Sequence, residues 1–322
     1  MRVAIVNDVA GVGRLEQRAL REAGVEADFF DVPRPGARWP FWAKALVGPV
    51  RLMASIPLIA RLHEYDLVHV HFVSQGFLGA LSGRPYVLHA HGSDLHANLR
   101  RPLLRAWSRM WMRRARGIFY VTPNLAGFLR DFAEKAVLLP NPVDLDRFAH
   151  IEPPSAVARG LLFMRLEAIK GPDVVFDAVS EVARHLKLSA VSWGPLAESY
   201  RDRYGDVVEF IDPVPHDQVP DMLSRTDVVV GQLRQGAMGL SELEALAAAR
   251  VVLMRLDATD DPPPVINVSS GDEILSAIVR LQNEPDEVSR IARSGREWVR
   301  AHNGLSVHAD ALNAAYAKAM RR

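Results

Sequence analysis

Two cations follow a short apolar run in the segment 163–172. Arg165 and Lys170 lie just beyond a predicted strand, on a loop that leads into a predicted helix, and Gly171 permits the turn. Fixed cations at the carboxyl end of a strand suit a diphosphate leaving group, whose negative charge grows as its bond breaks. The alternative is that both are ordinary solvated residues, which is the usual place of a single Arg or Lys.

A second candidate anion site lies between the valine run 228–230 and the segment 240–249, which consists of strong helix formers with leucines at helical spacing. The loop between them contains three glycines, Gly231, Gly236 and Gly239. Glycines let the backbone approach an anion, and the first N–H groups of a helix have no partner within it. Ser241 and Glu244 also match a capping box, which is the structural interpretation of both.

Histidines recur at alternate positions in two predicted strands. His69 and His71 share one strand face, and His89 and His91 share a face of another, with Asp94 close behind. They fit a metal site completed by Asp94, hydrogen bonding of a substrate by His91 at a strand end, or histidines satisfied by the backbone in a tight loop. The metal interpretation is the least favoured, because no histidine pair here matches a strong zinc spacing.

The elements that must position these residues alternate between short apolar runs and helical patterns. The predicted strands are 3–6, 27–30, 67–70, 86–89, 118–121, 137–139, 161–164, 188–192, 207–211, 228–230, 251–254 and 265–268. The predicted helices are 15–23, 172–185, 218–224, 240–249, 273–281, 287–302 and 307–320. Several strands are apolar on both faces, which is typical of parallel strands covered by helices on both sides. Ligands of such doubly wound domains bind beyond the carboxyl ends of the strands.

Prolines at 140, 142, 153 and 154 bracket a segment that cannot continue a helix or a central strand. We therefore predict an α/β protein of two Rossmann-like, doubly wound domains that face each other across a cleft. The 322 residues are long enough for two cores.

The composition excludes several classes. With no cysteine there is neither a disulfide nor a thiolate metal site, and a net charge of +1 gives no argument for a nucleic-acid partner. No apolar run is long enough to span a membrane, and the run 3–6 is too short for a signal peptide. We expect a soluble cytoplasmic protein, at most peripheral at the inner face of the membrane.

Four segments, in this order, resemble the signatures of glycosyltransferase family 4, the retaining nucleotide-sugar transferases of GT-B fold. They are His91-Gly-Ser-Asp94, Leu139-Pro-Asn-Pro-Val-Asp-Leu-Asp-Arg-Phe148, Arg165 through Lys170-Gly171, and Gly239-Leu-Ser-Glu-Leu-Glu-Ala-Leu-Ala247. The resemblance covers the whole chain. It implies an acceptor-side domain over 1–150, a donor-side domain over 151–304, and a final helix, 305–322, that packs back on the first domain.

The resemblance also implies roles for the matched residues on the donor side. Arg165 and Lys170 would neutralise the leaving diphosphate, and backbone N–H groups at Gly239 and Leu240 would cradle it. Glu244 would accept hydrogen bonds from the ribose hydroxyls.

On the other side, His91 would contact the donor sugar, and the loop from Gly11 to Gly13 would leave room for sugar and diphosphate. No protein nucleophile and no metal or other cofactor is expected, since the leaving phosphate is thought to help deprotonate the acceptor. Asp144 and Asp146 match a metal-binding D-x-D pattern, but their place in the interdomain motif argues against that use.

Two departures from the family pattern stand out. The first of the family's two glutamates, which contacts donor-sugar hydroxyls, falls on Gly236, and Gln235 or Arg234 is a hypothetical substitute. The family's turn after the helix is replaced by residues 247–252 without its glycine and proline.

The acceptor side is expected near the very basic segment 99–116. On a helix its arginines form one row and its tryptophans another, which suits an anionic membrane surface. The aromatic stretch 39–58 adds to this pattern. The alternative, slightly favoured, is that the tryptophans face the core and the arginines are a solvated outer face. The tentative residues are Arg105, Trp107, Arg109 and Trp111.

The leading hypothesis is thus a metal-independent retaining glycosyltransferase. It would move a hexose or related sugar from a nucleotide-diphosphate sugar to a glycan, a glycolipid or lipid-linked acceptor, or a small molecule. The alternatives are a nucleotide-sugar 2-epimerase of the same fold and a non-catalytic nucleotide-sugar-binding protein.

Overall fold

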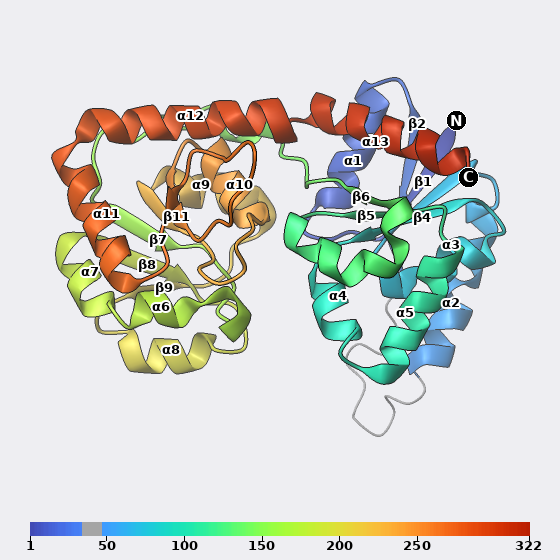
Figure 1. Cartoon of the computed structure of the whole chain (residues 1–322), viewed down its shortest axis with the longest axis horizontal. Helices are drawn as coiled ribbons and strands as arrows, with labels where there is room; N and C mark the ends of the chain where they lie inside the picture. Colours follow the sequence, from blue (N-terminus) through green and yellow to red (C-terminus); the bar gives the residue numbers. More distant parts are fainter. Residues whose placement is uncertain (34–46) are drawn as a thin grey trace. The chain divides into compact units, whose positions relative to one another are not determined.

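The computed structural model describes residues 1–33 and 47–322. The chain divides into two compact units, one of Met1–Pro142 together with Leu305–Arg322 and the other of Val143–Gly304 (Figure 1). Each unit is built on one six-stranded sheet whose strand pairs are all parallel. The doubly wound α/β architecture predicted from the alternating pattern is confirmed.

The sheet of the first unit has the strand order β2-β1-β3-β4-β5-β6. Its strands are β1 (Arg2–Val6), β2 (Glu26–Phe30), β3 (Leu67–His71), β4 (Tyr86–Ala90), β5 (Gly117–Tyr120) and β6 (Ala136–Leu138). All six were predicted, with ends displaced by at most one residue. Strands apolar on both faces explain the success, because a short β-branched run covered on both sides has few alternatives.

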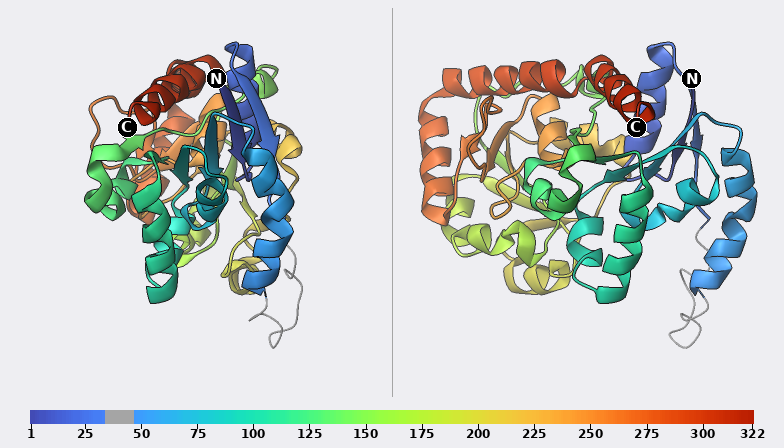
Figure 2. Two further views of the ribbon diagram at one scale, coloured as in Figure 1. Left: turned by 90° about the vertical axis from the view of Figure 1, so that its right-hand side faces the viewer. Right: turned by 45° about the vertical axis from the view of Figure 1, so that its right-hand side comes forward.

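Alternate residues of this sheet pack against two different layers of helices. Val3 and Ile5 face α1 (Val12–Glu22) and α13 (Leu305–Met320), which lie side by side although nearly the whole chain separates them (Figures 1 and 2). Ala4, Val6 and their neighbours face the other layer. That layer contains α2 (Val47–Leu62), α3 (Phe77–Leu81), α4 (Ser93–Asn98), α5 (Pro102–Arg114) and the 3-10 segment Pro123–Lys135.

The sheet of the second unit has the order β12-β11-β10-β7-β8-β9. Its strands are β7 (Arg159–Leu162), β8 (Lys187–Val191), β9 (Glu209–Ile211), β10 (Val228–Val230), β11 (Val251–Met254) and β12 (Ile266–Asn267). One face packs on α6 (Pro172–Phe176), α7 (Val179–His185) and α11 (Gly271–Asn283), and the other on α9 (Val219–Ser224) and α10 (Leu240–Ala247), while α12 (Pro285–Asn303) contributes residues to both cores. The remaining helix is α8 (Ala197–Tyr204).

Several expectations about the elements were wrong or incomplete. The continuous helix predicted over 172–185 is two helices, because the backbone at Ala178 leaves the helical region (φ −110°, ψ 9°) where Gly271 of α11 packs against its side chain. The strand predicted at 161–164 begins two residues earlier, and the strand predicted at 207–211 begins two residues later. Helices α2, α3, α4 and α8 were not predicted, and the aromatic residues at 39, 41 and 42 lie outside the described residues.

Candidate functional site

The loops that follow two neighbouring strands, β7 and β10, hold Lys170 between them. Its Nζ donates to the side-chain oxygens of Gln232 (3.0 Å) and Gln235 (2.7 Å), and its carbonyl accepts from the N–H of Leu233 (2.8 Å). Both side-chain partners are neutral amides, so they orient the ammonium without cancelling its charge. A fixed cation at the carboxyl edge of the sheet, with no ion-pair partner among the described residues, is what an anion requires.

Arg165 lies on the same loop, three residues after the end of β7. Its side chain is half exposed, and its nearest carboxylate is that of Glu167 at 3.8 Å. Leu166 fastens the loop by a hydrogen bond from its N–H to the carbonyl of Trp193 (2.8 Å). Gly194, at φ +109°, has no room for a side chain, because a Cβ there would lie 2.7 Å from the carbonyl oxygen of Leu166. The structure therefore places both predicted cations on one loop.

The first turn of α10 is capped differently from the prediction. The carboxylate of Glu242, buried in the fold, accepts from the backbone N–H groups of Gly239 (2.9 Å) and Gln232 (2.9 Å). The capping box assigned to Ser241 and Glu244 is therefore wrong, because the helix begins at Leu240 and its capping carboxylate is two residues earlier than assumed. The N–H of Gly239 is engaged by this cap, and the N–H groups of Leu240 and Ser241, at the start of the first turn, have no acceptor within the helix.

Glu244 is buried one turn further along α10, and its carboxylate lies 2.5 Å from Nε2 of His216. His216 is itself held through its carbonyl, which accepts from the guanidinium of Arg147. Glu244 thus has a partner that approaches from the loop after β9, and the imidazole of His216 is partly exposed beside it.

Gly236 has a left-handed backbone (φ +66°), and the carboxylate of Asp257 lies where its side chain would begin. The two hypothetical substitutes for the glutamate absent here have other partners. Gln235 binds Lys170, and Arg234 pairs with Asp173. Asp257, which the sequence did not suggest, is the carboxylate that the structure brings to this position.

In the first unit, Gly11 and Gly13 lie at the junction of β1 and α1. Gly11 is the left-handed N-cap of α1 (φ +83°), and the N–H of Gly13 donates to Asp8 Oδ1 (3.0 Å). A Cβ on Gly13 would lie 2.7 Å from the carbonyl oxygen of Asn7. Both glycines are therefore required for a close turn, whatever else this loop does.

The histidines of β3 and β4 surround a carboxylate that the sequence did not reveal. Glu16 of α1 is fully buried, and its Oε2 lies 3.1 Å from Nε2 of His71 and 3.4 Å from Nδ1 of His69. Its Oε1 lies 3.3 Å from Nδ1 of His89 and 3.2 Å from Nε2 of His308 on α13. We call Glu16 and these four residues the histidine cluster.

The electrostatics of this cluster favour an ionised carboxylate at Glu16. Burial opposes ionisation of Glu16, but the surrounding imidazoles outweigh it and hold its pKa well below the usual range. Burial also lowers the pKa values of His69, His89 and His91, which keeps these rings neutral near pH 7. A buried charge is tolerated only when it is hydrogen bonded, and here the imidazole N–H groups supply those bonds.

Glu16, His69, His71 and His89 also offer four ligand atoms within 4.8 Å of one another, a spacing that could hold a metal ion. The metal hypothesis from the sequence included Asp94, but its carboxylate holds backbone groups instead. Its carboxylate accepts from the backbone N–H groups of Val73 (3.0 Å), His91 (3.1 Å) and Leu95 (3.0 Å). Of the four imidazoles, those of His71 and His308 hydrogen bond to Glu16, whereas Nε2 of His69 and both ring nitrogens of His89 are buried with no hydrogen-bond partner among the described residues.

Glu16 and His308 were missed because each is a polar residue in a helix that reads as amphipathic. The buried positions of α1 include Val12, Ala19 and Leu20, and Glu16 falls on the same stripe at helical spacing. His308 shares the buried stripe of α13 in the same way. A titratable residue on the apolar stripe of a helix was the available signal.

The tentative acceptor-side residues on α5 do not form one exposed face. Trp111 is buried in the core (6% exposed), whereas Trp107 is 40% exposed and its indole N–H donates to the carbonyl of Ser74 (2.9 Å). Arg109 pairs with Asp131, and Arg105 is exposed. Trp111 is therefore unavailable to a membrane, and none of the described helices is long and apolar enough to cross one.

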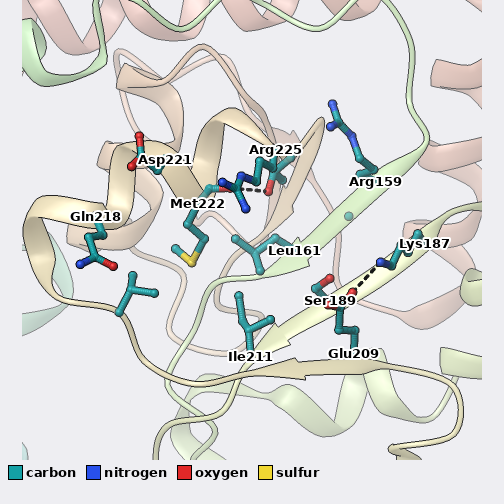
Figure 3. A pocket seen from close by; sticks show the side chains of 13 residues that line it. Arg159, Leu161, Lys187, Ser189, Glu209, Ile211, Gln218, Asp221, Met222 and Arg225 are labelled. Atoms are coloured by element: carbon teal, nitrogen blue, oxygen red, sulfur yellow. Dashed lines mark hydrogen bonds and ion pairs between the residues drawn. The ribbon is translucent and has the colours of Figure 1, made fainter.

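A cavity of about 560 Å³ lies elsewhere in the second unit, between α9 and the sheet (Figure 3). Its lining includes Arg159 and Lys187, which begin β7 and β8, and Lys187 is already paired with Glu209 (2.7 Å). The cavity extends toward the amino ends of these strands, whereas Arg165 and Lys170 follow the carboxyl end of β7. It has no part in the site described above.

Comparisons with known proteins agree with this architecture. Residues 9–147 match the model of Glycosyltransferase Family 4, and residues 158–282 match that of Glycosyl transferases group 1. The 2-deoxystreptamine glucosyltransferase of Streptomyces kanamyceticus is 26% identical over 78% of this chain and 76% of its own length.

Solved structures share the fold at lower identity. The sucrose-phosphate synthase of Thermosynechococcus elongatus superposes with a TM-score of 0.75 at 16% identity, covering all of both chains. Anabaena HepE in complex with UDP-glucose gives 0.70 at 14% identity, covering 98% of this chain and 99% of its own. Together, the matched family models and the two parallel sheets show that the chain belongs to glycosyltransferase family 4 and has the GT-B fold.

Proposed function

We propose that the protein is a retaining glycosyltransferase that uses a nucleotide-diphosphate sugar and needs no metal. The bond from the anomeric carbon to the diphosphate oxygen breaks, and a bond to an acceptor hydroxyl forms on the same face of the sugar. The leaving phosphate takes the proton of that hydroxyl. The acceptor is a glycan, a glycolipid or a small molecule.

One observation carries this proposal: Lys170 is oriented by two neutral amides rather than by a carboxylate. Its charge remains available to a diphosphate, and Arg165 on the same loop adds a second cation. Gln232 connects the Lys170 ammonium to the first turn of α10, because its own N–H donates to the capping carboxylate of Glu242. The N–H groups of Leu240 and Ser241 then supply donors for phosphate oxygens.

The remaining donor contacts follow from the neighbouring carboxylates. Glu244 is proposed to accept from the ribose hydroxyls, competing with His216 for the same oxygen. Asp257 is proposed to receive the sugar hydroxyls at the position where the family pattern has the glutamate replaced here by Gly236. In the first unit, His91 is proposed to contact a sugar hydroxyl, and the turn at Gly11 and Gly13 to leave space for it.

The test is thermal unfolding of the purified protein with UDP, GDP, ADP, dTDP and their common sugars, with and without EDTA. A ligand at a hundred times its Kd stabilises by about 2.7 kcal/mol, which gives a clear shift in Tm. We expect a shift with one nucleotide diphosphate, insensitive to EDTA and lost in Lys170→Ala. Lys187→Ala is the matched control, because that lysine is paired with Glu209 and begins the adjacent strand.

No shift with any nucleotide would contradict the proposed donor site. Binding without turnover of any donor sugar, including slow hydrolysis, would instead indicate a non-catalytic nucleotide-sugar-binding protein.

A further inference from the structure

A continuous chain of hydrogen bonds links the buried carboxylate of Glu16 to His91. Oε2 of Glu16 lies 3.1 Å from Nε2 of His71, and Nδ1 of His71 lies 2.8 Å from Nε2 of His91. Glu16 and His71 are fully buried, whereas His91 is only partly buried and follows the carboxyl end of β4. This chain of hydrogen bonds therefore runs from the interior of the first unit to a residue that a substrate can reach.

The chemistry of the three groups fixes which atoms carry hydrogen. An ionised carboxylate only accepts, so Nε2 of His71 must be the donor to Glu16. In a neutral His71 the other nitrogen, Nδ1, is then a bare acceptor, and Nε2 of His91 must carry the hydrogen that fills it. A neutral His91 is left with a bare Nδ1.

His71 is packed among other buried imidazole rings. Its ring stacks on that of His69 at 4.7 Å and lies 5.1 Å from that of His89, and all three rings are excluded from water. The second carboxylate oxygen is within reach of His308, so the charge of Glu16 does not depend on His71 alone.

We propose that Glu16 and His71 are positioning residues that hold His91 as the Nε2–H tautomer, so that its Nδ1 accepts a hydrogen bond from a substrate hydroxyl. Nδ1 of His91 has no hydrogen-bond partner among residues 1–33 and 47–322. Its backbone N–H is fixed by Asp94 Oδ1 (3.1 Å), which leaves the ring as the group that meets substrate. The assignment of the hydroxyl to a sugar rests on the proposed function, whereas the tautomer does not.

The tautomer is measured without substrate or activity. In protein labelled with ¹⁵N at histidine, long-range ¹H–¹⁵N correlation spectra at pH 8 separate the two neutral tautomers and the imidazolium. The His91 signals are identified by their absence in His91→Ala. We expect a protonated Nε2 and a bare Nδ1. A His91 ring protonated at Nδ1 overturns the proposal, and so does one equivalent of zinc in the purified protein, because a metal would displace the hydrogen on His71.

A second arm tests the consequence for binding. Glu16→Gln should release the tautomer of His91 and weaken nucleotide-sugar binding roughly tenfold, with less than a twofold change for the nucleotide diphosphate alone. Tyr316→Phe is the control. It removes a buried hydroxyl that lies 2.7 Å from His69 Nδ1, yet leaves the hydrogen bonds from Glu16 through His71 to His91 intact.

A double-mutant cycle distinguishes a positioning role of Glu16 from a general contribution to folding stability. In a His91→Ala background, Glu16→Gln should cause no further loss of nucleotide-sugar affinity, since the residue through which it acts is gone. A full additional tenfold loss would show that Glu16 acts through the fold and would overturn the proposal. If Glu16→Gln does not fold, the spectrum of the unaltered protein still decides the tautomer.

Discussion

The carboxylate of Asp257 lies against the backbone of Gly236, in the space that a side chain on residue 236 would enter. The N–H of Asp257 donates to the carbonyl of Gly236 (2.9 Å), and the N–H of Arg255 donates to the carbonyl of Gln232 (3.0 Å). The loop after β11 is thus fastened to the loop that precedes α10. Because Gly236 has no side chain, the carboxylate of Asp257 can occupy this position.

We expect Gly236→Glu to destabilise the protein by about 1–2 kcal/mol, because the left-handed backbone at φ +66° is unfavourable for any residue with a Cβ. Displacement of Asp257 adds to this cost, and Asp257→Ala in the same chain should remove only that addition. Urea unfolding measures both. Gly127→Ala is the control, since it meets nothing within 4 Å and needs no left-handed backbone. Unchanged donor preference and rate in Gly236→Glu would place the residue outside the sugar site.

The two carboxylates of α10 should contribute to different properties, that of Glu242 to stability and that of Glu244 to nucleotide binding. In Glu242→Gln the amide cannot accept from both Gly239 and Gln232, so a buried N–H loses its partner at a cost of about 1–3 kcal/mol. Glu244→Gln keeps this cap and should weaken nucleotide binding with little change in Tm. Calorimetric titration with the nucleotide diphosphate, beside thermal unfolding, tests both. The opposite pattern would assign the ribose to Glu242.

The sheets were predictable from the sequence because most of their central strands, such as β1, β10 and β11, are short apolar runs buried on both faces. Valines 228–230 and 251–252 are all buried, as expected of parallel strands that helices cover on both faces. Helix α2 escaped prediction because Pro57 lies inside it and its apolar residues do not keep to one face: Met53 and Ile56 are more than half exposed. The local pattern identifies a helix only where its burial is periodic.

The candidate site was predictable where it depends on chain order and not where it depends on contacts between distant residues. Arg165 and Lys170 were identified from a strand, a glycine and a helix in sequence. No local pattern brings Asp257 to Gly236, since the contact spans β11 and the whole of α10. Glu16 and His308 are farther apart still, and only the packing of α13 on α1 joins them.

Asp94 should give the stability a specific dependence on pH. Burial outweighs three backbone N–H donors and raises the pKa of Asp94 to about 6, above the value of about 3.9 expected in the unfolded chain. Between these values the folded state holds a proton that the unfolded state releases, so its contribution is complete below pH 4 and is lost as pH rises through 6.

Asp94→Asn removes this titration. The free energy of unfolding of the unaltered protein, minus that of Asp94→Asn, should fall by about 2 kcal/mol from pH 4 to pH 7 and then stay level. Taking the difference cancels Glu16, whose lowered pKa acts in the opposite direction and at lower pH. Urea unfolding at half-unit intervals measures both curves, and parallel curves would show that the pKa of Asp94 is the same in the folded and unfolded states.

The exposed part of α5 decides whether the acceptor is reached at a membrane. With Trp111 buried, the surface that remains is Leu103, 86% exposed, Trp107 and the arginines that include Arg105. We expect weak sedimentation with vesicles containing anionic lipid and none with neutral vesicles, since each arginine near an anionic surface contributes about 1 kcal/mol. Arg105→Glu and 0.5 M salt should each abolish it, as an attraction between charges requires. Failure of anionic vesicles to carry the protein down would make the basic face a solvated surface and favour an acceptor in solution.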